Sequence, residues 1–435
     1  MCGTMRAADS RERGLGGSLD RVVGWVAAHA NVIVAVAVGF AVVVSAGLAI
    51  HQGASLRYHD ERQYMDIVDN LVHRHQYSLD GVGPTAYKPP AWPFLLAAGR
   101  WLGLGIVGLK FINVALLGAC VYGGSRLARR VAGPAAGALA AIVIAVCPVA
   151  IYTASTLYPQ IMGGALLLWG LVAATGIPDS PRPGRQAALT GLLFSLLLLT
   201  VPTLATAFVA VLIWLLVTAG RAGWRILALA VAAAAVLPIG WAIRNTVQMN
   251  AFIPVATDDG VNLLLGNSEN AGPDTGVNAD ISRYIDSAER RGLDEVETSD
   301  YYRNAAIDWI KANPGDAASL YVRKVVHHFG FRDQLATDES ASPARDLAVA
   351  LTYYPLLALV IVRFALSRRR RPSSIEIMLV GWYLAFGLVT AAFFPRIRFR
   401  LPADLVLFAE AAVAAVVLVG MTSRAPEPAP EPAVD

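Results

Sequence analysis

The sequence predicts an all-α polytopic membrane protein built from a bundle of about ten transmembrane helices. Of its 435 residues, 56% are hydrophobic and only 16% are charged, whereas about a quarter of the residues of a water-soluble domain are charged. The apolar residues also gather in long runs, and the run 31–50 contains no charged side chain. A helix of about 20 apolar residues spans the hydrocarbon core of a bilayer.

Ten apolar runs have the composition of spanning helices. They cover residues 31–50, 106–125, 132–150, 157–177, 186–200, 203–219, 225–243, 346–364, 375–393 and 402–421. The runs on either side of Pro202 are short, which is compatible with a tight hairpin of tilted helices. A further stretch, 91–104, is shorter and is interrupted by Arg100, so it is more typical of a re-entrant or interfacial segment.

The basic clusters indicate how the helices are oriented. If 91–104 does not span, the clusters at 126–130, 182–185, 221–225 and 368–371 are all cytoplasmic, as the positive-inside rule prefers. If it spans, all of them lie outside. We therefore expect a cytoplasmic N-terminus at 1–30, an N-terminal transmembrane module at 31–245 with a first outer catalytic loop at 51–104, an extracytoplasmic segment at 246–345, C-terminal transmembrane helices at 346–421 and a disordered tail at 422–435.

The composition also disfavours other classes. The net charge of +4 lies in short clusters rather than on one basic face, so we expect no nucleic-acid binding. Cys2, Cys120 and Cys147 do not form a disulfide framework. The arginine- and alanine-rich composition hints at a GC-rich bacterium. We expect a multi-pass protein of the bacterial cytoplasmic membrane, with the first apolar run as an uncleaved signal anchor.

The first outer loop begins with a predicted amphipathic helix. Its apolar residues, from Tyr64 to Val72, recur at helical spacing, so we expect it to lie on the outer membrane surface. Asp60 and Glu61 stand at its start. Aspartate as an N-cap and glutamate in the first turn would stabilise the helix. Carboxylates at the mouth of a membrane bundle are also candidates for a general base, and one residue can serve both roles.

Residues 87–94 read Tyr-Lys-Pro-Pro-Ala-Trp-Pro-Phe. The prolines oppose a regular helix start, and irregular backbone at membrane depth requires protein or a watery cavity around it. Lys88 is one of few lysines in an arginine-dominated chain. Its side chain either reaches lipid headgroups or holds a lipid phosphate.

Two further elements contain candidate binding residues. Arg244 and Asn245 end the seventh run, where they either anchor the helix at headgroups or reach a donor. Arg396, Arg398 and Arg400 precede the last run, and an extended backbone would place them on one side. Because this cluster lies outside, against the positive-inside preference, we expect it to bind an anionic lipid phosphate. Headgroup snorkelling is the alternative.

The remainder of the second outer segment gives weaker signals. Asp258, Asp259 and Gly260 are typical of a turn, and metal ligation by them is the less favoured alternative. Residues 298–313 predict an amphipathic helix that ends before Pro314, followed by a second helix capped by Asp316. We predict no metal-binding residues and no required cofactor, and a divalent metal is left open.

The order of these elements resembles the lipid-dependent C-type glycosyltransferases (GT-C). An acidic pair follows the first helix, a Lys-Pro-Pro segment leads an apolar re-entrant stretch, and an Arg-x-Arg-Leu-Pro element precedes the last helix. Protein O-mannosyltransferases and the aminoarabinose transferase of lipid A are similar in this way. The resemblance implies a GT-C-like bundle with outer juxtamembrane helices and a mixed outer loop segment.

The resemblance also implies roles for individual residues. Asp60, with Glu61 beside it, would be the base or acceptor-orienting group, and Lys88 would contact the carrier phosphate. The three arginines of the last outer loop would share that phosphate. We expect further donor or acceptor contacts from Arg57, Tyr58, Tyr87, Arg244 and Asn245.

The implied activity is transfer of a hexose or pentose from a polyprenyl-phosphate donor to an extracytoplasmic glycan, lipid or protein by inverting displacement. One alternative is a glycan ligase or oligosaccharyltransferase that uses a pyrophosphate-linked donor. Another is a lipid or solute transporter, which would favour ionisable residues near the middle of the spans. The central spans of this sequence carry almost no charge.

Overall fold

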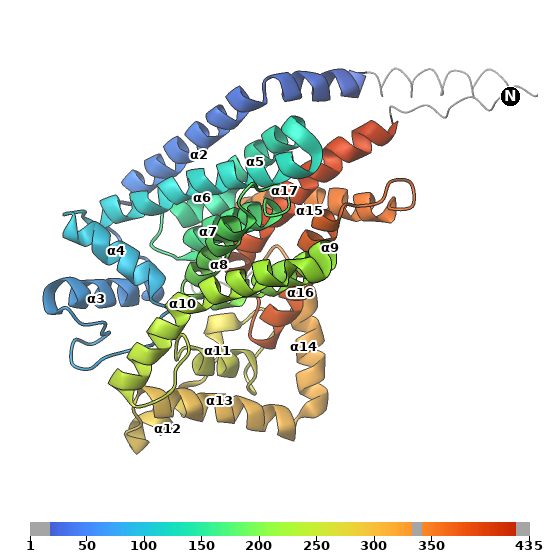
Figure 1. Ribbon diagram of the computed structural model, residues 1–435. Helices are drawn as coiled ribbons and strands as arrows, with labels where there is room; N and C mark the ends of the chain where they lie inside the picture. Colours follow the sequence, from blue (N-terminus) through green and yellow to red (C-terminus); the bar gives the residue numbers. More distant parts are fainter. Residues whose placement is uncertain (1–17, 333–341, 423–435) are drawn as a thin grey trace, which may run out of the picture.

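The computed structural model describes residues 18–332 and 342–422 (Figure 1). These residues are mostly helical and contain no β-strand, which confirms the predicted all-α class. The predicted disordered tail lies, apart from Thr422, outside the described residues. Six described helices are long and apolar enough to cross a membrane, namely α2 (Ala30–Gln52), α5 (Ile106–Ala145), α10 (Trp224–Met249), α15 (Pro343–Ala365), α16 (Ser374–Ala392) and α17 (Ile397–Thr422).

The other predicted runs fall on shorter helices or share one. The runs 106–125 and 132–150 share α5, whose backbone breaks at Ala132 and Gly133, where φ of the glycine is +82°. The two halves form a hairpin, because a Cβ added at Gly124 would collide with Ile144. The remaining runs form α6 (Pro148–Ala154), α7 (Gln160–Thr175), α8 (Pro183–Leu198) and α9 (Thr206–Ala219).

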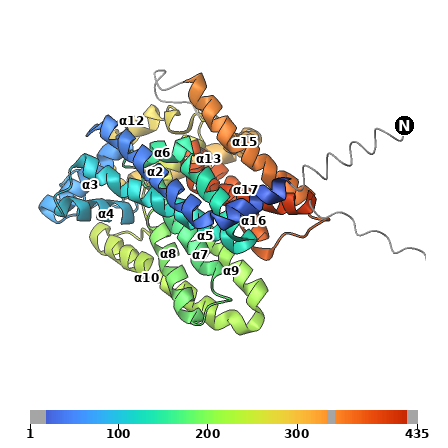
Figure 2. The same ribbon diagram turned by 90° about the horizontal axis from the view of Figure 1, so that it is seen from above.

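α17 lies at the centre of the bundle and α10 at its edge. Of the most apolar window of each helix, 61% is buried in α17 and 11% in α10. α17 packs against α5, α7, α15 and α16, as Figure 2 shows from above. α10 packs mainly on α8 and leaves Ile239, Ile243 and Val247 exposed. An exposed apolar face of this kind on a membrane-spanning helix is suited to contact with lipid.

The C-terminal helices contain more buried charge than the N-terminal ones. Arg363 of α15 and Glu376 of α16 form a buried ion pair with a 2.9 Å Nε to Oε1 distance. Glu410, in α17, is 1% exposed and has no hydrogen-bond partner within the described ranges. The expected near absence of charge from the central spans therefore does not extend to α17.

The two long polar segments meet at the end of the bundle that lies away from the first described residues and the end of α17 (Figure 1). We call their helices and loops the headpiece. It consists of α3 (His59–Arg74), α4 (Ala91–Trp101), α11 (Asp259–Gly266), α12 (Ser282–Arg291), α13 (Glu295–Ala312) and α14 (Pro314–His328).

The apolar stripe of α3 packs against protein rather than a membrane surface. Ile67 and Val68 are fully buried in a cluster with Leu96 of α4 and Leu109 of α5. The spacing correctly predicts the stripe, but it does not identify the surface that covers it. α4 has 11 residues, or about 16 Å of helix, which is too short to cross a bilayer. This length agrees with the expectation that the stretch 91–104 does not span the membrane.

Several helix starts differ from the expected ones. α4 begins at Ala91 directly after Pro90, so the prolines end the irregular loop without preventing the helix. Asp258 and Asp259 start α11 instead of forming a turn. Asp316 lies in the first turn of α14 without capping it, because that helix begins at Pro314 with Asn313 as the N-cap.

One buried lysine joins the headpiece to the last two bundle helices. The ammonium of Lys324, a fully buried residue of α14, donates hydrogen bonds to Gly266 O at 3.0 Å, Asn267 Oδ1 at 3.2 Å and Phe393 O at 2.8 Å. Gly266 ends α11, and Phe393 lies between α16 and α17. A Cβ on Gly266 would collide with the Phe393 carbonyl, so this junction requires a glycine.

We expect Gly266→Ala to destabilise the protein, because overfilling a packed site costs about 1–3 kcal/mol. The measurement is the fraction that remains monodisperse in detergent after heating over a range of temperatures. Gly315→Ala is the control, since Gly315 faces open space and alanine favours a helix. Equal thermal profiles for the two variants would contradict the role of Gly266.

Candidate active site

The start of α3 is fixed by the carboxylate of Glu61. Its Oε2 accepts hydrogen bonds from the backbone N–H groups of Arg57 at 3.0 Å and Tyr58 at 3.1 Å. Its Oε1 accepts one from Leu157 N at 2.9 Å, across the bundle. Glu61 is 1% exposed. These three bonds fix the first turn of α3 and hold the neighbouring Asp60 in place.

Asp60 contacts two cations that come from distant parts of the chain. Its Oδ1 accepts a hydrogen bond from Lys88 Nζ at 3.2 Å, and its Oδ2 accepts one from Arg398 Nη2 at 3.1 Å. The side chains of Asp60, Lys88 and Arg398 are 31%, 10% and 25% exposed. The guanidinium of Arg398 also lies 3.8 Å from the ring centroid of Tyr158. This cluster is therefore partly buried but open on one side.

The loop that carries Lys88 is held by two charged side chains. Arg244 of α10 donates to Thr85 O at 2.7 Å and to Tyr77 O at 3.1 Å. Glu295 of α13 accepts from Ala86 N at 2.9 Å. Tyr77 closes the loop through its hydroxyl, which donates to Lys88 O at 2.8 Å. The loop is irregular, but its position is determined by the bundle and the headpiece together.

Asp258 also belongs to this site, although its sequence context predicts a turn. Its Oδ2 lies 3.9 Å from Lys88 Nζ, and its side chain is 23% exposed. The next residue, Asp259, is directed elsewhere and pairs with Arg303 at 3.0 Å. The signal that could have found Asp258 is its place before Val261 and Leu264, an apolar spacing that predicts a helix start.

The two carboxylates beside Lys88 differ in acidity. Burial alone would raise the pKa of Asp60, but the charges and hydrogen bonds of Lys88 and Arg398 lower it below its ordinary value. Burial raises the pKa of Asp258 to about 6, because Lys88 offsets the effect only in part and Asp259 and Asp60 add to it. The pKa of Lys88 is raised: burial opposes its charge, but Asp60 and its other neighbours more than compensate.

The three arginines of the last loop do not share one side. α17 begins at Ile397, so the backbone is helical rather than extended. Arg398 alone reaches Asp60. Arg396 donates to Thr275 O at 2.9 Å. Arg400 is 2% exposed and pairs with Asp404 at 2.9 Å. The expectation that an extended backbone places the three arginines on one side is thus wrong, because helical geometry turns them toward different partners. Phosphate binding by any of them stays a prediction.

The other sequence candidates lie around the cluster. Tyr87 stacks below Lys88, with 4.9 Å from the ammonium to the ring centroid. The Tyr58 hydroxyl hydrogen-bonds that of Tyr152 at 2.6 Å. The side chain of Arg57 is exposed. Asn245 is fully buried and donates to Ile253 O at 3.0 Å, so it braces the backbone and does not reach the cluster.

Within the described ranges, no three His, Cys, Asp or Glu side chains gather in a way that could hold a metal ion.

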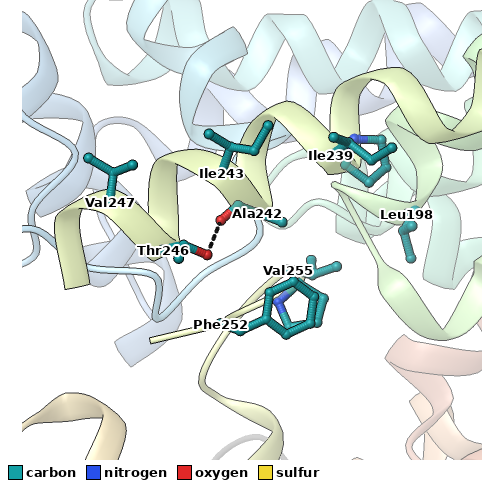
Figure 3. A pocket seen from close by; sticks show the side chains of 10 residues that line it. Leu198, Ile239, Ala242, Ile243, Thr246, Val247, Phe252 and Val255 are labelled. Atoms are coloured by element: carbon teal, nitrogen blue, oxygen red, sulfur yellow. Dashed lines mark hydrogen bonds between the residues drawn. The ribbon is translucent and has the colours of Figure 1, made fainter. Parts of the chain in front are cut away.

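An apolar groove of about 490 Å³ runs along the edge of α10 (Figure 3). Ile239, Ile243 and Val247 of α10 form one wall, and Phe252 and Val255 of the following loop form the other. The Val255 carbonyl accepts a hydrogen bond from Trp241 Nε1 at 2.7 Å, which fixes this loop to the helix. The same loop continues from Val255 to Asp258. The groove therefore ends close to the charged cluster.

Comparison with known proteins identifies the fold. No family model and no curated protein matches the sequence. Archaeal oligosaccharyltransferase AglB from Archaeoglobus fulgidus, solved in complex with an inhibitory peptide and a dolichol-phosphate, is similar with a TM-score of 0.55 and 16% identity over 88% of this chain and 50% of that chain. The Archaeoglobus fulgidus oligosaccharyltransferase tethered to an acceptor peptide is similar with a TM-score of 0.53 and 15% identity, over 90% of this chain and 50% of that chain. ArnT from Cupriavidus metallidurans, bound to undecaprenyl phosphate, has a TM-score of 0.44 and 16% identity, over 90% of this chain and 78% of that chain.

The likeness to the oligosaccharyltransferase shows that this chain has the GT-C fold, as the sequence resemblance implied. Its six long apolar helices are those of a multi-pass membrane protein. The chain spans about half the length of that protein.

We expect Arg244→Ala to loosen the loop that carries Lys88. The variant loses two hydrogen bonds from a charged donor, each typically contributing about 1.5–3 kcal/mol, so local opening should become at least about tenfold more frequent. Amide hydrogen exchange of residues 77–88 measures this. Arg225→Ala, at the other end of α10, is the control, and equal exchange in both variants would contradict the bracing role of Arg244.

Proposed function

We propose that this protein is an integral membrane glycosyltransferase that transfers a hexose or pentose from a polyprenyl-phosphate donor to an extracytoplasmic glycan, lipid or protein. The fold supports the transferase class, because an oligosaccharyltransferase has it. The observation that carries the proposal is the contact of one carboxylate, Asp60, with the two cations Lys88 and Arg398. This arrangement combines a proton acceptor with charges that match a phosphate.

The groove beside α10 supports a lipid-linked donor. Each CH₂ group of a polyprenyl chain buried there contributes about 0.8 kcal/mol. Only two residues separate Val255, which lines the groove, from Asp258, which lies beside Lys88. A chain held in the groove keeps its phosphate near the cations and lowers the entropic cost of meeting the acceptor.

In the transfer step, Asp60 accepts the proton of the acceptor hydroxyl while the acceptor oxygen bonds to the anomeric carbon. The bond between that carbon and the phosphate oxygen breaks on the opposite face, so the configuration inverts. Polyprenyl phosphate leaves with the electron pair. Lys88 and Arg398 neutralise the negative charge that develops on it.

The same two cations control the strength of the base. While they contact Asp60, they lower its pKa, and the carboxylate is a poor proton acceptor. A donor phosphate competes for the N–H groups of Lys88 and Arg398. Its binding therefore raises the proton affinity of Asp60 when the reaction needs a base. Without a donor, the base is weak.

Glu61 supports this reaction as a positioning residue in our proposal. Its oxygens accept three backbone hydrogen bonds, which hold the first turn of α3 and thereby Asp60. Tyr58, Tyr87 and the exposed Arg57 surround the open side of the cluster and are candidates for contact with the sugar or the acceptor. The basic clusters between the helices support an extracytoplasmic site in a bacterial cytoplasmic membrane.

A second candidate is transfer of a preassembled glycan from a pyrophosphate-linked carrier. The TM-score of 0.55 to an oligosaccharyltransferase favours it. The site favours a single phosphate, because within the described ranges only Lys88 and Arg398 contact the central carboxylate. The length of the donor distinguishes the two: consumption of a pyrophosphate-linked oligosaccharide, but not of a phosphate-linked monosaccharide, would overturn our proposal.

We expect Asp60→Asn to lower sugar transfer by about 10²–10⁴-fold, the usual contribution of a general base. The assay uses membranes with a panel of radiolabelled polyprenyl-phosphate sugars and cell-extract acceptors. Asp69→Asn is the control on the same helix, because among the described residues Asp69 pairs with Arg100 at 3.5 Å and not with the cluster. If Asp60→Asn is as abundant and as active as the wild type, the base must be sought elsewhere, first at Glu61.

Among the arginines of the last loop, we expect Arg398→Gln to lower transfer by about 10²–10³-fold, as loss of one electrostatic donor does. Arg396→Gln should change it by only a few fold, because Arg396 contacts a backbone carbonyl outside the cluster. Initial rates at saturating donor test this. Equal losses in the two variants would favour the joint phosphate site that an extended loop would have formed.

A further inference from the structure

We propose that Asp258 balances charge in the phosphate site, taking up a proton from solvent when a lipid-linked phosphodiester binds beside Lys88. This inference rests on the proposed function and adds a second carboxylate to it. Asp258 lies on α11, far along the chain from the acidic pair of α3, yet its Oδ2 is 3.9 Å from the Lys88 ammonium. Among the described residues, Lys88 is the cation within ion-pair distance of Asp258.

The argument begins with the charges that share this space. Asp60 and Asp258 supply two negative charges, and Lys88 and Arg398 supply two positive ones, so the empty site is neutral with all four ionised. A phosphodiester adds one negative charge at the same cations. Because the four side chains are only 10–31% exposed, this excess charge is costly there. One carboxylate must therefore bind a proton or lose its cation.

Geometry selects Asp258 for the proton. Asp60 has cations at 3.2 Å and 3.1 Å on its two oxygens, whereas the single cation near Asp258 is at 3.9 Å. The pKa of Asp258 is raised to about 6 by burial, while that of Asp60 is lowered. Asp258 thus binds a proton at a higher pH, and a phosphate nearby raises its pKa further.

The tyrosines and the lysine that face Asp258 do not titrate in the relevant range. The tyrosines 64, 77 and 87 have raised pKa values because of burial. Asp259 faces Arg303 at 3.0 Å. Lys88 stays charged, because its pKa is also raised. A pH dependence of phosphodiester binding near neutrality is therefore assigned to Asp258.

The test is binding of farnesyl methyl phosphodiester to the full chain in nanodiscs between pH 5 and 8. A diester probe is needed because a phosphate monoester itself titrates near pH 6. Wild type should bind tightest below about pH 6 and weaken by up to about tenfold per pH unit above it, until the higher pKa of the bound state is reached. Asp258→Asn should bind tightly at every pH, because the amide is always neutral.

Asp259→Asn is the matched control, since it removes the same charge one residue away. It should keep the wild-type slope but begin it at a lower pH, because the charge of Asp259 contributes to the raised pKa of Asp258. An equal slope in Asp258→Asn, or no slope in the wild type, would overturn this inference while leaving the proposed function intact. No binding of the probe at any pH would instead remove the phosphate site on which both depend.

A second measurement on the wild type alone does not depend on the variant folding. Calorimetric titration at pH 6.5 in buffers of different ionisation enthalpy counts the protons taken up with the probe. A fraction of a proton per bound probe is expected, and zero uptake would overturn the role of Asp258. Asparagine is itself a favoured N-cap, so we expect Asp258→Asn to retain the start of α11.

Discussion

Lys88 carries its charge into a site where its side chain is 10% exposed, and this ammonium constrains the surrounding structure. An unpaired buried charge costs on the order of several kcal/mol, so anionic partners must come to it. No single segment supplies them: Asp60 comes from α3 and Asp258 from α11. Meeting this one requirement brings the two polar segments of the headpiece together, and the irregular loop between Tyr77 and Pro90 can then be held by Arg244 and Glu295.

In our proposal, the carboxylates that pair with Lys88 also compete with the donor phosphate for its N–H groups. A site that binds phosphate through cations needs carboxylates to balance those cations while it is empty, and the carboxylates must give up their cations or bind a proton when the phosphate arrives. Asp60 and Asp258 differ in which of these they can do. Asp60, with a cation on each oxygen, can give up its cations and become a base. Asp258, with one more distant cation and a raised pKa, can become neutral. The same electrostatic conflict thus supports both catalysis and binding.

Much of the fold follows from periodicity and length. The apolar runs all lie on helices, and the break at Ala132 and Gly133 folds two of them, 106–125 and 132–150, into a hairpin. The sequence also pointed to Asp60 and Lys88, because both stand in local patterns, and the structure brings them into contact. It could not place Asp258, which contacts a residue distant in the chain. It predicted an extended backbone at Arg396 and Arg400, whereas the helix start at Ile397 directs these side chains differently. The sequence correctly predicted which residues form the apolar stripe of α3. It could not predict that α4 and α5 cover this stripe, because that depends on tertiary packing.

The position of Arg398 depends on contacts outside the active site. Arg398 lies in the first turn of α17, five residues after Phe393, whose carbonyl accepts a hydrogen bond from Lys324 at 2.8 Å. A helix start fixed by a buried hydrogen bond can hold a guanidinium over Tyr158 and against Asp60 with little freedom. Burial lowers the pKa of Lys324 to about 8, so some of its population is neutral in alkaline conditions. Because this pKa lies below the ordinary value of a lysine, the unfolded chain binds the proton more tightly than the folded one. The stability linked to Lys324 therefore rises as pH passes through that value, independently of the carboxylates in the site.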